Sequence, residues 1–307
     1  MWRVDQPVQG LRPGDFVAPA GSEAVLAGIA KETGVDFAAL KAEVKQGAHQ
    51  VKRLRVGMYQ RYRGGNIDEG WSRLLLEQFS FPYTSVMDAE IKKGNLNQKY
   101  DLIILPDDST AAITGERSSA GAAADAQATP TPRRVDEEIP PEYRSGIGAE
   151  GVKSLTAFVE KGGTLVTLGG ASSFAIEKLE LGLRNVVAGR NTREFWCPGS
   201  TLKVNADVTN PLAYGMPPDA LAVYMSGNPV FEITPSAHNE EYEVVVRYAD
   251  KDLLQSGWLI GEQILAKKAA MVAAKYKAGR VILIGFRAQH RAQTHGTYKL
   301  LFNTLVR

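Results

Sequence analysis

The sequence has a single cysteine, Cys197, which excludes an internal disulfide framework and a cysteine-based zinc site. No apolar run reaches the roughly 18 residues needed to cross a bilayer, and stretches such as 281–286 are only strand-sized. The first residues lack the apolar core of a secretion signal, so we expect none in the chain as given. The net charge of +2 gives no electrostatic reason to expect nucleic acid or an anionic membrane as a partner.

What the sequence does contain is a globular composition, with 44% apolar and 23% charged residues in 307. That length suits one large α/β domain or two modest ones. From residue 53 onward strand and helix patterns alternate. The strands are predicted over 54–59, 84–87, 100–105, 164–168, 269–275 and 281–286, and the helices over 68–79, 88–94, 149–161, 173–181 and 297–306. Apolar strands between helices are typical of parallel sheets covered on both faces. We therefore predict an α/β fold with a doubly wound, mostly parallel sheet.

Residues 1–50 differ from this pattern and predict an N-terminal connector with short helices, ahead of an α/β domain over 51–307. One helix is expected over 22–33, with Val25, Leu26 and Ile29 on one apolar face. A second is expected over 36–45. The basic residues between 41 and 55 fit a solvated helix end and a strand entry.

Three later segments also stand out. Residues 109–148 are rich in alanine, glycine, threonine and proline, which predicts a mobile loop that folding does not need, open to proteases near Arg117 and Arg133. Short β segments separated by proline and asparagine fill 200–265, with the clearest strand over 243–248. The sequence Lys277-Ala-Gly-Arg280 predicts a tight hairpin loop in which glycine takes the special backbone position.

Polar side chains gather where the predicted strands end. Ligands of open α/β sheets bind beyond the carboxyl ends of the strands, so these residues are the candidate ligand-binding set: Arg73, Asp107, Gly169, Gly170, Ser172, Arg287 and His290. Two arginines near a helix N-terminus favour a small anion such as a carboxylate or phosphate. The alternative also stands: loops are polar in any case, Asp68 and Glu69 can simply begin a helix, and Arg73 can tie that helix to the sheet.

Individual motifs are weak. The sequence Gly169-Gly-Ala-Ser172 matches neither a Walker A loop nor a serine hydrolase elbow, and a tight turn with a serine cap accounts for it. His238-x-x-Glu241 has the spacing of two zinc ligands but lies in a proline-rich turn, a poor platform for a metal. His290 can act as a general base, or it can be a structural histidine. Cys197 is expected to be buried and inert.

Several phrases together resemble a known family. They are Gly70-Trp-Ser-Arg73, Tyr100-Asp-Leu-Ile-Ile-Leu-Pro-Asp107, Gly162-Gly-Thr-Leu-Val-Thr-Leu-Gly-Gly170, Gly279-Arg-Val-Ile-Leu-Ile-Gly-Phe-Arg287 and Gln289-His-Arg-Ala-Gln-Thr-His-Gly-Thr-Tyr-Lys-Leu-Leu-Phe-Asn303. Nearly the whole chain resembles the C-terminal region of bacterial zinc carboxypeptidase-family proteins (carboxypeptidase A-like metallopeptidases). That resemblance implies a class I glutamine-amidotransferase-like (flavodoxin-like) domain, a hydrolytic parent family and an exported location.

Two departures from the resemblance bear on function. The position that matches the amidotransferase cysteine is Leu168, and no His-x-Glu follows the last strand. The zinc ligands of a peptidase would lie upstream, so no cofactor is expected here and zinc only in a peptidase domain. We expect a non-catalytic accessory or ligand-binding module. The alternatives are a hydrolase that uses His290, Asp107 and Ser172, and a domain that docks a peptidase domain.

Overall fold

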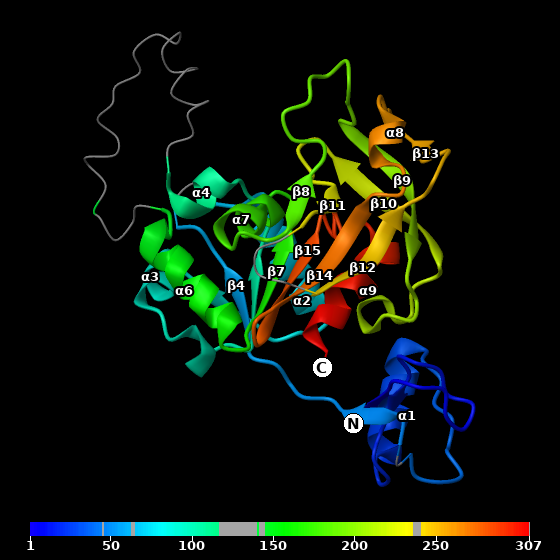
Figure 1. Ribbon diagram of the computed structural model, residues 1–307. Coiled ribbons are helices and arrows are strands. Elements are labelled where there is room, and N and C mark those ends of the chain that lie inside the picture. The colour runs from blue at the N-terminus through cyan, green and yellow to red at the C-terminus, as the bar shows by residue number, and fades with distance from the viewer. Residues whose placement is uncertain (45, 63–64, 117–139, 141–144, 236–240, 307) are drawn as a thin grey trace.

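A mixed sheet of 12 strands forms the centre of the protein in the computed structural model (Figure 1). The structure describes residues 1–44, 46–62, 65–116, 140, 145–235 and 241–306. Five neighbouring strands pair in parallel: β5 (Thr84–Val86), β4 (Val56–Tyr59), β6 (Leu102–Leu105), β7 (Thr164–Leu168) and β15 (Gly279–Ile284). In chain order this is 2-1-3-4-5, the flavodoxin-like arrangement, in which the order reverses between the first and third strands. That reversal lies between β4 and β6.

Helices cover both faces of these five strands, because successive side chains of a strand point to opposite faces. Met58 and Ile104 pack with Leu75 of α2 (Ile67–Gln78) in one apolar core, to which α9 (Tyr298–Phe302) also contributes. Ile103 and Leu105 face the opposite core. That core contains residues of α3 (Asp88–Lys93), α4 (Thr110–Thr114), α6 (Gly148–Glu160) and α7 (Ala171–Lys178). The predicted α/β arrangement is therefore present.

The β-rich segment continues the same sheet instead of forming an appendage. Beyond β15 the strands are antiparallel: β14 (Ala269–Tyr276), β12 (Glu241–Tyr248), β9 (Gly199–Ala206) and β10 (Asp219–Met225). Three short strands, β8 (Leu183–Asn185), β11 (Phe231–Ile233) and β13 (Leu254–Ser256), attach to them, and α8 spans Glu262–Leu265. A bridge between Val223 of β10 and Arg287 brings β10 back to the end of β15.

The hairpin between β14 and β15 lies where it was predicted, but its glycine is required for a different reason. Lys277, and not Gly279, has the positive φ of 51°. A Cβ on Gly279 would lie 2.1 Å from the Val159 carbonyl oxygen and 2.4 Å from that of Gly163. Close approach of the α6 end to the strand therefore requires glycine here.

The N-terminal residues form a small sheet and only one of the two predicted helices. Its strands are β1 (Trp2–Val4), β2 (Phe16–Val17) and β3 (Ala48–Gln50), in the order β2-β1-β3. The helix α1 (Glu23–Thr33) is present, but none of its residues is buried, so its apolar face does not pack as expected. The helix expected over 36–45 is absent from its described part, 36–44.

This N-terminal sheet contacts the α/β domain through Arg3, which is buried. Its guanidinium carbon lies 5.4 Å from the ring centre of Tyr214, and its Nη1 donates to the carbonyl oxygen of Val306 at 3.3 Å. A cation over an aromatic face is a favourable contact. The tyrosine hydroxyl in turn donates to the Asp5 carbonyl oxygen.

The segment predicted as a mobile loop over 109–148 begins as ordered structure. Ser109 accepts a hydrogen bond from the Ala112 amide and so caps α4, and Ile113 and Ile147 are fully buried. Residues 117–139 and 141–144, where the loop and protease predictions fall, lie outside the described residues. At the other end, the predicted helix over 297–306 is divided into α9 and a 3-10 turn over Asn303–Leu305.

In the described residues, three other 3-10 turns span Leu96–Gln98, Pro211–Ala213 and His295–Thr297. Among the helices that the structure describes, none has both the length and the apolar character that crossing a bilayer requires.

Candidate functional site

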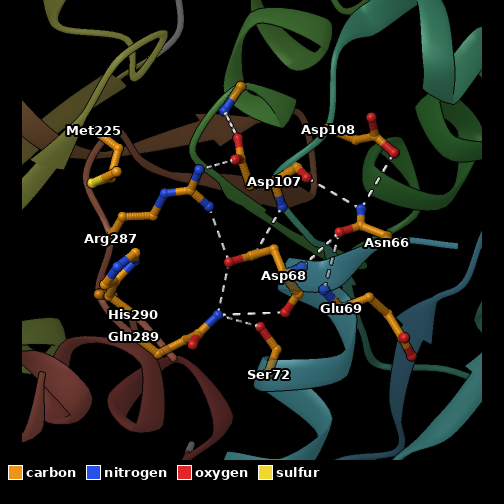
Figure 2. A network of polar contacts seen from close by, with 12 residues as sticks. Asn66, Asp68, Glu69, Ser72, Asp107, Asp108, Met225, Arg287, Gln289 and His290 are labelled. Carbon is orange, nitrogen blue, oxygen red and sulfur yellow. Dashed lines mark hydrogen bonds and ion pairs between the residues drawn. The ribbon is translucent and has the colours of Figure 1, made fainter. Parts of the chain in front are cut away.

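Side chains from the ends of β4, β6 and β15 meet in one hydrogen-bonded group, which we call the edge network (Figure 2). Its members are Asn66, Asp68, Ser72, Asp107, Asp108, Arg287 and Gln289. Because β4 and β6 flank the reversal in strand order, the network lies where open α/β sheets bind ligands.

Asn66 ties the start of α2 to the end of β6. It is in extended backbone conformation, and its Oδ1 accepts from the amides of Asp68 and Glu69 at 2.9 and 3.1 Å, which makes it the N-cap. Its Nδ2 donates to the Asp107 carbonyl oxygen at 3.1 Å and to Asp108 Oδ2 at 3.3 Å. One side chain thus fixes both the helix and the neighbouring strand end.

Asp68 is the central acceptor of the network. Its Oδ1 accepts from Gln289 Nε2 at 2.8 Å and Arg287 Nη1 at 3.1 Å, and its Oδ2 accepts from the Asp107 amide at 3.0 Å. Burial, which outweighs these donors, raises the pKa of Asp68 to about 6. The sequence also allowed Asp68 to do no more than begin a helix. The structure shows that this residue is part of the site itself.

Arg287 joins two carboxylates that come from different strand ends. Its Nη1 contacts Asp68 and its Nη2 contacts Asp107 Oδ2, and about a fifth of the Arg287 and Asp107 side chains is exposed. The Arg287 amide donates to the Val223 carbonyl oxygen at 2.9 Å, so β10 holds the arginine in place. The cation proposed from sequence to attract an anion is already paired.

The turn after β7 has the geometry of a strand-to-helix elbow. Gly169 has a φ of +52°, and the next amide, that of Gly170, donates to Asp107 Oδ1. A Cβ on Gly169 would lie 2.3 Å from that same oxygen and 3.0 Å from Asn228 Nδ2. The Asp107 carboxylate thus fills the space next to the elbow and accepts the hydrogen bond of the Gly170 amide.

Two buried polar atoms of the network have no hydrogen-bond partner within the described part of the chain. They are Arg287 Nε, a donor, and Gln289 Oε1, an acceptor. Buried polar groups are nearly always satisfied by protein, water or ligand. Figure 2 shows His290 beside both residues, and burial, reinforced by Arg287 and Arg291, lowers its pKa. His290 is therefore neutral near pH 7.

The sequence-predicted set is only partly brought together. Asp107, Gly169, Gly170 and Arg287 meet, and His290 lies next to them. Ser172 does not join them with its hydroxyl, which is fully buried and shares a 3.0 Å hydrogen bond with Thr167 Oγ1.

Arg73 makes its ion pair along its own helix, with Glu69 at 3.6 Å. The alternative in which Arg73 ties this helix to the sheet is thus replaced by a pair within α2.

Three residues at the site were not predicted from the sequence: Asn66, Gln289 and Asn228. Asn66 carried a signal, since an asparagine two residues before an acidic pair is typical of a helix start. The other two come from loops, and nothing local predicts which way they face. Within the described residues, no group of three or more His, Cys, Asp or Glu side chains could hold a metal ion.

We expect Asp68→Asn to alter how stability depends on pH. A folded pKa of about 6 against an ordinary value of 3.8 means that the folded chain binds the extra proton between these values. Stability is therefore lost as pH rises through that window, by up to about 3 kcal/mol at 1.36 kcal/mol per pKa unit. Urea unfolding should show the free energy of unfolding of Asp68→Asn rising relative to that of the parent, by up to this amount, as the pH is raised from 4 to 7.

The exposed Asp252→Asn is the matched control for this experiment and should run parallel to the parent at every pH. A constant difference between Asp68→Asn and the parent across the range would contradict a raised pKa at Asp68.

No protein-family model matches the sequence, and no curated protein matches it. Among solved structures, the chain is similar to a putative ThuA-like protein from Bacteroides uniformis, at 12% identity over 86% of this chain and 93% of that one, with a TM-score of 0.43. A putative GMP synthase subunit from Thermoplasma acidophilum has 10% identity over 83% and 94% of the two chains, with a TM-score of 0.46. PurLQS from Thermotoga maritima has 16% identity over 82% and 98%, also at 0.46. Similarity at this level assigns neither family nor function.

Proposed function

We propose that this chain is a non-catalytic binding module whose edge network recognises a small, uncharged polar ligand. The observation that carries the proposal is the elbow after β7. In serine hydrolases of the α/β type the nucleophile stands on such a turn, and the following amide helps to bind the oxyanion. Here the turn residue is Gly169, which has no side chain. The amide that follows it already donates a hydrogen bond to the Asp107 carboxylate.

Neither of the two nucleophile candidates among the described residues suits the hydrolase alternative. Ser172 is fully buried, and its hydroxyl is hydrogen-bonded to Thr167. Cys197 is buried in the core on the α2 side of the sheet, and burial raises the pKa of its thiol, which keeps it protonated. A nucleophile needs a base within hydrogen-bond reach, and the described part of the chain places none beside either residue.

The charges of the network argue for an uncharged ligand. Arg287 already faces two carboxylates, so a further anion would meet Asp68 and Asp107 at close range. The unsatisfied atoms are one donor, Arg287 Nε, and one acceptor, Gln289 Oε1. A hydroxyl or amide group can both accept and donate, and so could satisfy both kinds of atom. The anion expected from sequence is not favoured at this edge.

We further propose an accessory role beside a zinc carboxypeptidase-like domain, on the strength of the sequence phrases quoted above. A class I glutamine-amidotransferase-like fold, an exported location and a zinc site confined to the peptidase domain belong to the same proposal. The strand order 2-1-3-4-5 supports the fold part of it.

Saturation-transfer NMR tests the binding proposal, because it detects weak ligands. The probes are D-glucose and acetamide, which are neutral, and acetate, which is an anion. We expect saturable signals from a neutral probe and, in Gln289→Met, binding about 10-fold weaker, as one lost hydrogen bond predicts. The exposed Gln98→Met should behave as the parent.

Binding of acetate but of neither neutral probe, or equal binding of a neutral probe by parent and Gln289→Met, would reject the neutral-ligand site. Hydrolysis of a p-nitrophenyl ester that is lost in Ser172→Ala would instead support the hydrolase.

A further inference from the structure

A second charged site surrounds the strand pair β8 and β11, which lie side by side near α8 in Figure 1. It is a cavity of about 550 Å³, and we call it the β8–β11 cavity. Its charged lining consists of three cations, Arg184, Arg190 and Lys268, and one carboxylate, Glu232. The Gln263 amide adds a neutral polar group. The lining therefore carries an excess of two positive charges.

The loop that carries Arg190 is held by several hydrogen bonds. Asn185 Oδ1 accepts from the amides of Val187 and Val230 at 3.2 and 3.1 Å. The Val186 amide donates to the Val230 carbonyl oxygen at 2.9 Å, and Arg190 Nε donates to the Val186 carbonyl oxygen at 2.7 Å. The backbone and the Arg190 side chain are thus positioned before any ligand arrives, which lowers the entropic cost of binding.

Within the cavity, Glu232 lies between Lys268 and Arg184 and contacts both. These two cations, Lys268 first, lower the pKa of the Glu232 carboxyl. Arg190 contributes only a loose pair, with its Nη1 3.8 Å from Glu194. Two cations therefore already hold a carboxylate, while the third has hydrogen-bonding capacity to spare.

We propose that the β8–β11 cavity binds a phosphate-bearing small molecule, with the phosphate displacing Glu232 and binding the pre-positioned Arg190. A ligand with a single carboxylate would only exchange one carboxylate for another. A dianionic phosphate offers more charge and three strong acceptor oxygens, which suit guanidinium groups. The volume is in the range of small-molecule sites, so it accommodates an organic group as well.

Isothermal titration calorimetry with inorganic pyrophosphate, at ionic strength held constant with NaCl, tests this site. We expect saturable binding to the parent and about 10-fold weaker binding to Arg190→Ala, the loss expected for a charge-assisted hydrogen bond. Glu232→Gln removes the internal competitor and should tighten binding several-fold. The exposed Arg193→Ala, which does not line the cavity, is the matched control and should bind as the parent does.

Gln289→Met should leave pyrophosphate binding unchanged, which separates this site from the edge network. Non-saturable heats, equal weakening in Arg190→Ala and Arg193→Ala, or acetate binding as tightly as pyrophosphate would overturn the proposal. Arg190→Ala leaves the Glu232 ion pairs intact, so the test stands even if Glu232→Gln fails to fold.

Discussion

Arg287→Ala is expected to lower the free energy of unfolding by about 4 kcal/mol, because breaking a buried ion pair leaves its partner charge uncompensated. Both Asp68 and Asp107 lose their cation in this variant, and they approach each other at the end of β6. Urea denaturation at pH 7 measures the loss. Arg287→Lys should avoid only part of this loss, since one ammonium cannot contact both carboxylates as the guanidinium does.

The exposed Arg193→Ala is the control and should change stability by less than about 0.5 kcal/mol. Adding Asp68→Asn to Arg287→Ala should restore part of the loss, because it removes one of the stranded charges. A loss below about 1 kcal/mol in the single variant would show that the arginine does not hold the network together, and would reopen the anion-binding hypothesis.

Gly169→Ala is expected to cost a similar amount, about 4 kcal/mol. A φ of +52° strains any residue with a Cβ, by roughly 1–3 kcal/mol. The added methyl would also lie 2.3 Å from an Asp107 oxygen that Arg287 and the Gly170 amide hold in place. Thermal and urea unfolding should both report the loss.

A double-mutant cycle separates the two causes. In an Asp107→Ala background the clash with the carboxylate is gone, so Gly169→Ala should then cost less, leaving the backbone strain and the contact with Asn228. Gly70→Ala, inside α2 with no atom within 4 Å of the new Cβ, should instead stabilise the protein by roughly 0.5–1 kcal/mol. If Gly169→Ala costs the same in both backgrounds, the carboxylate does not fill the elbow.

The sequence predicted most of the parallel sheet because those strands carry their own signal. Apolar runs such as 102–105 and 164–168 are buried on both faces, and their helices begin and end at identifiable residues such as Asn66 and Gly162. Once strands and crossovers are placed, their carboxyl ends must share one edge. The meeting of Asp107, Gly170 and Arg287 follows from that rule.

Side-chain direction could not be predicted in the same way. Ser172 lies within the first turn of α7, one step from the edge, yet the turn directs its hydroxyl to Thr167 in the core. Arg73 has a neighbour four residues earlier on its own helix, Glu69, and pairs with it. The helix predicted over 36–45 is absent from its described part, 36–44, because weak local propensity had no packed surface to support it.

The bridge between Val223 and Arg287 also has a consequence for how the molecule reaches its native state. Contacts between residues far apart in sequence form slowly, because a long loop must close before they contribute any energy. The edge network joins residues 66–72, 107–108 and 287–289, and the Arg287 amide bonds to Val223, so we expect it to be complete only after β10 has returned to β15. A partly folded chain can contain α2 and β6 without a complete network. We therefore expect the edge network to be among the last parts of the molecule to assemble, because it forms only when both halves of the sheet have joined.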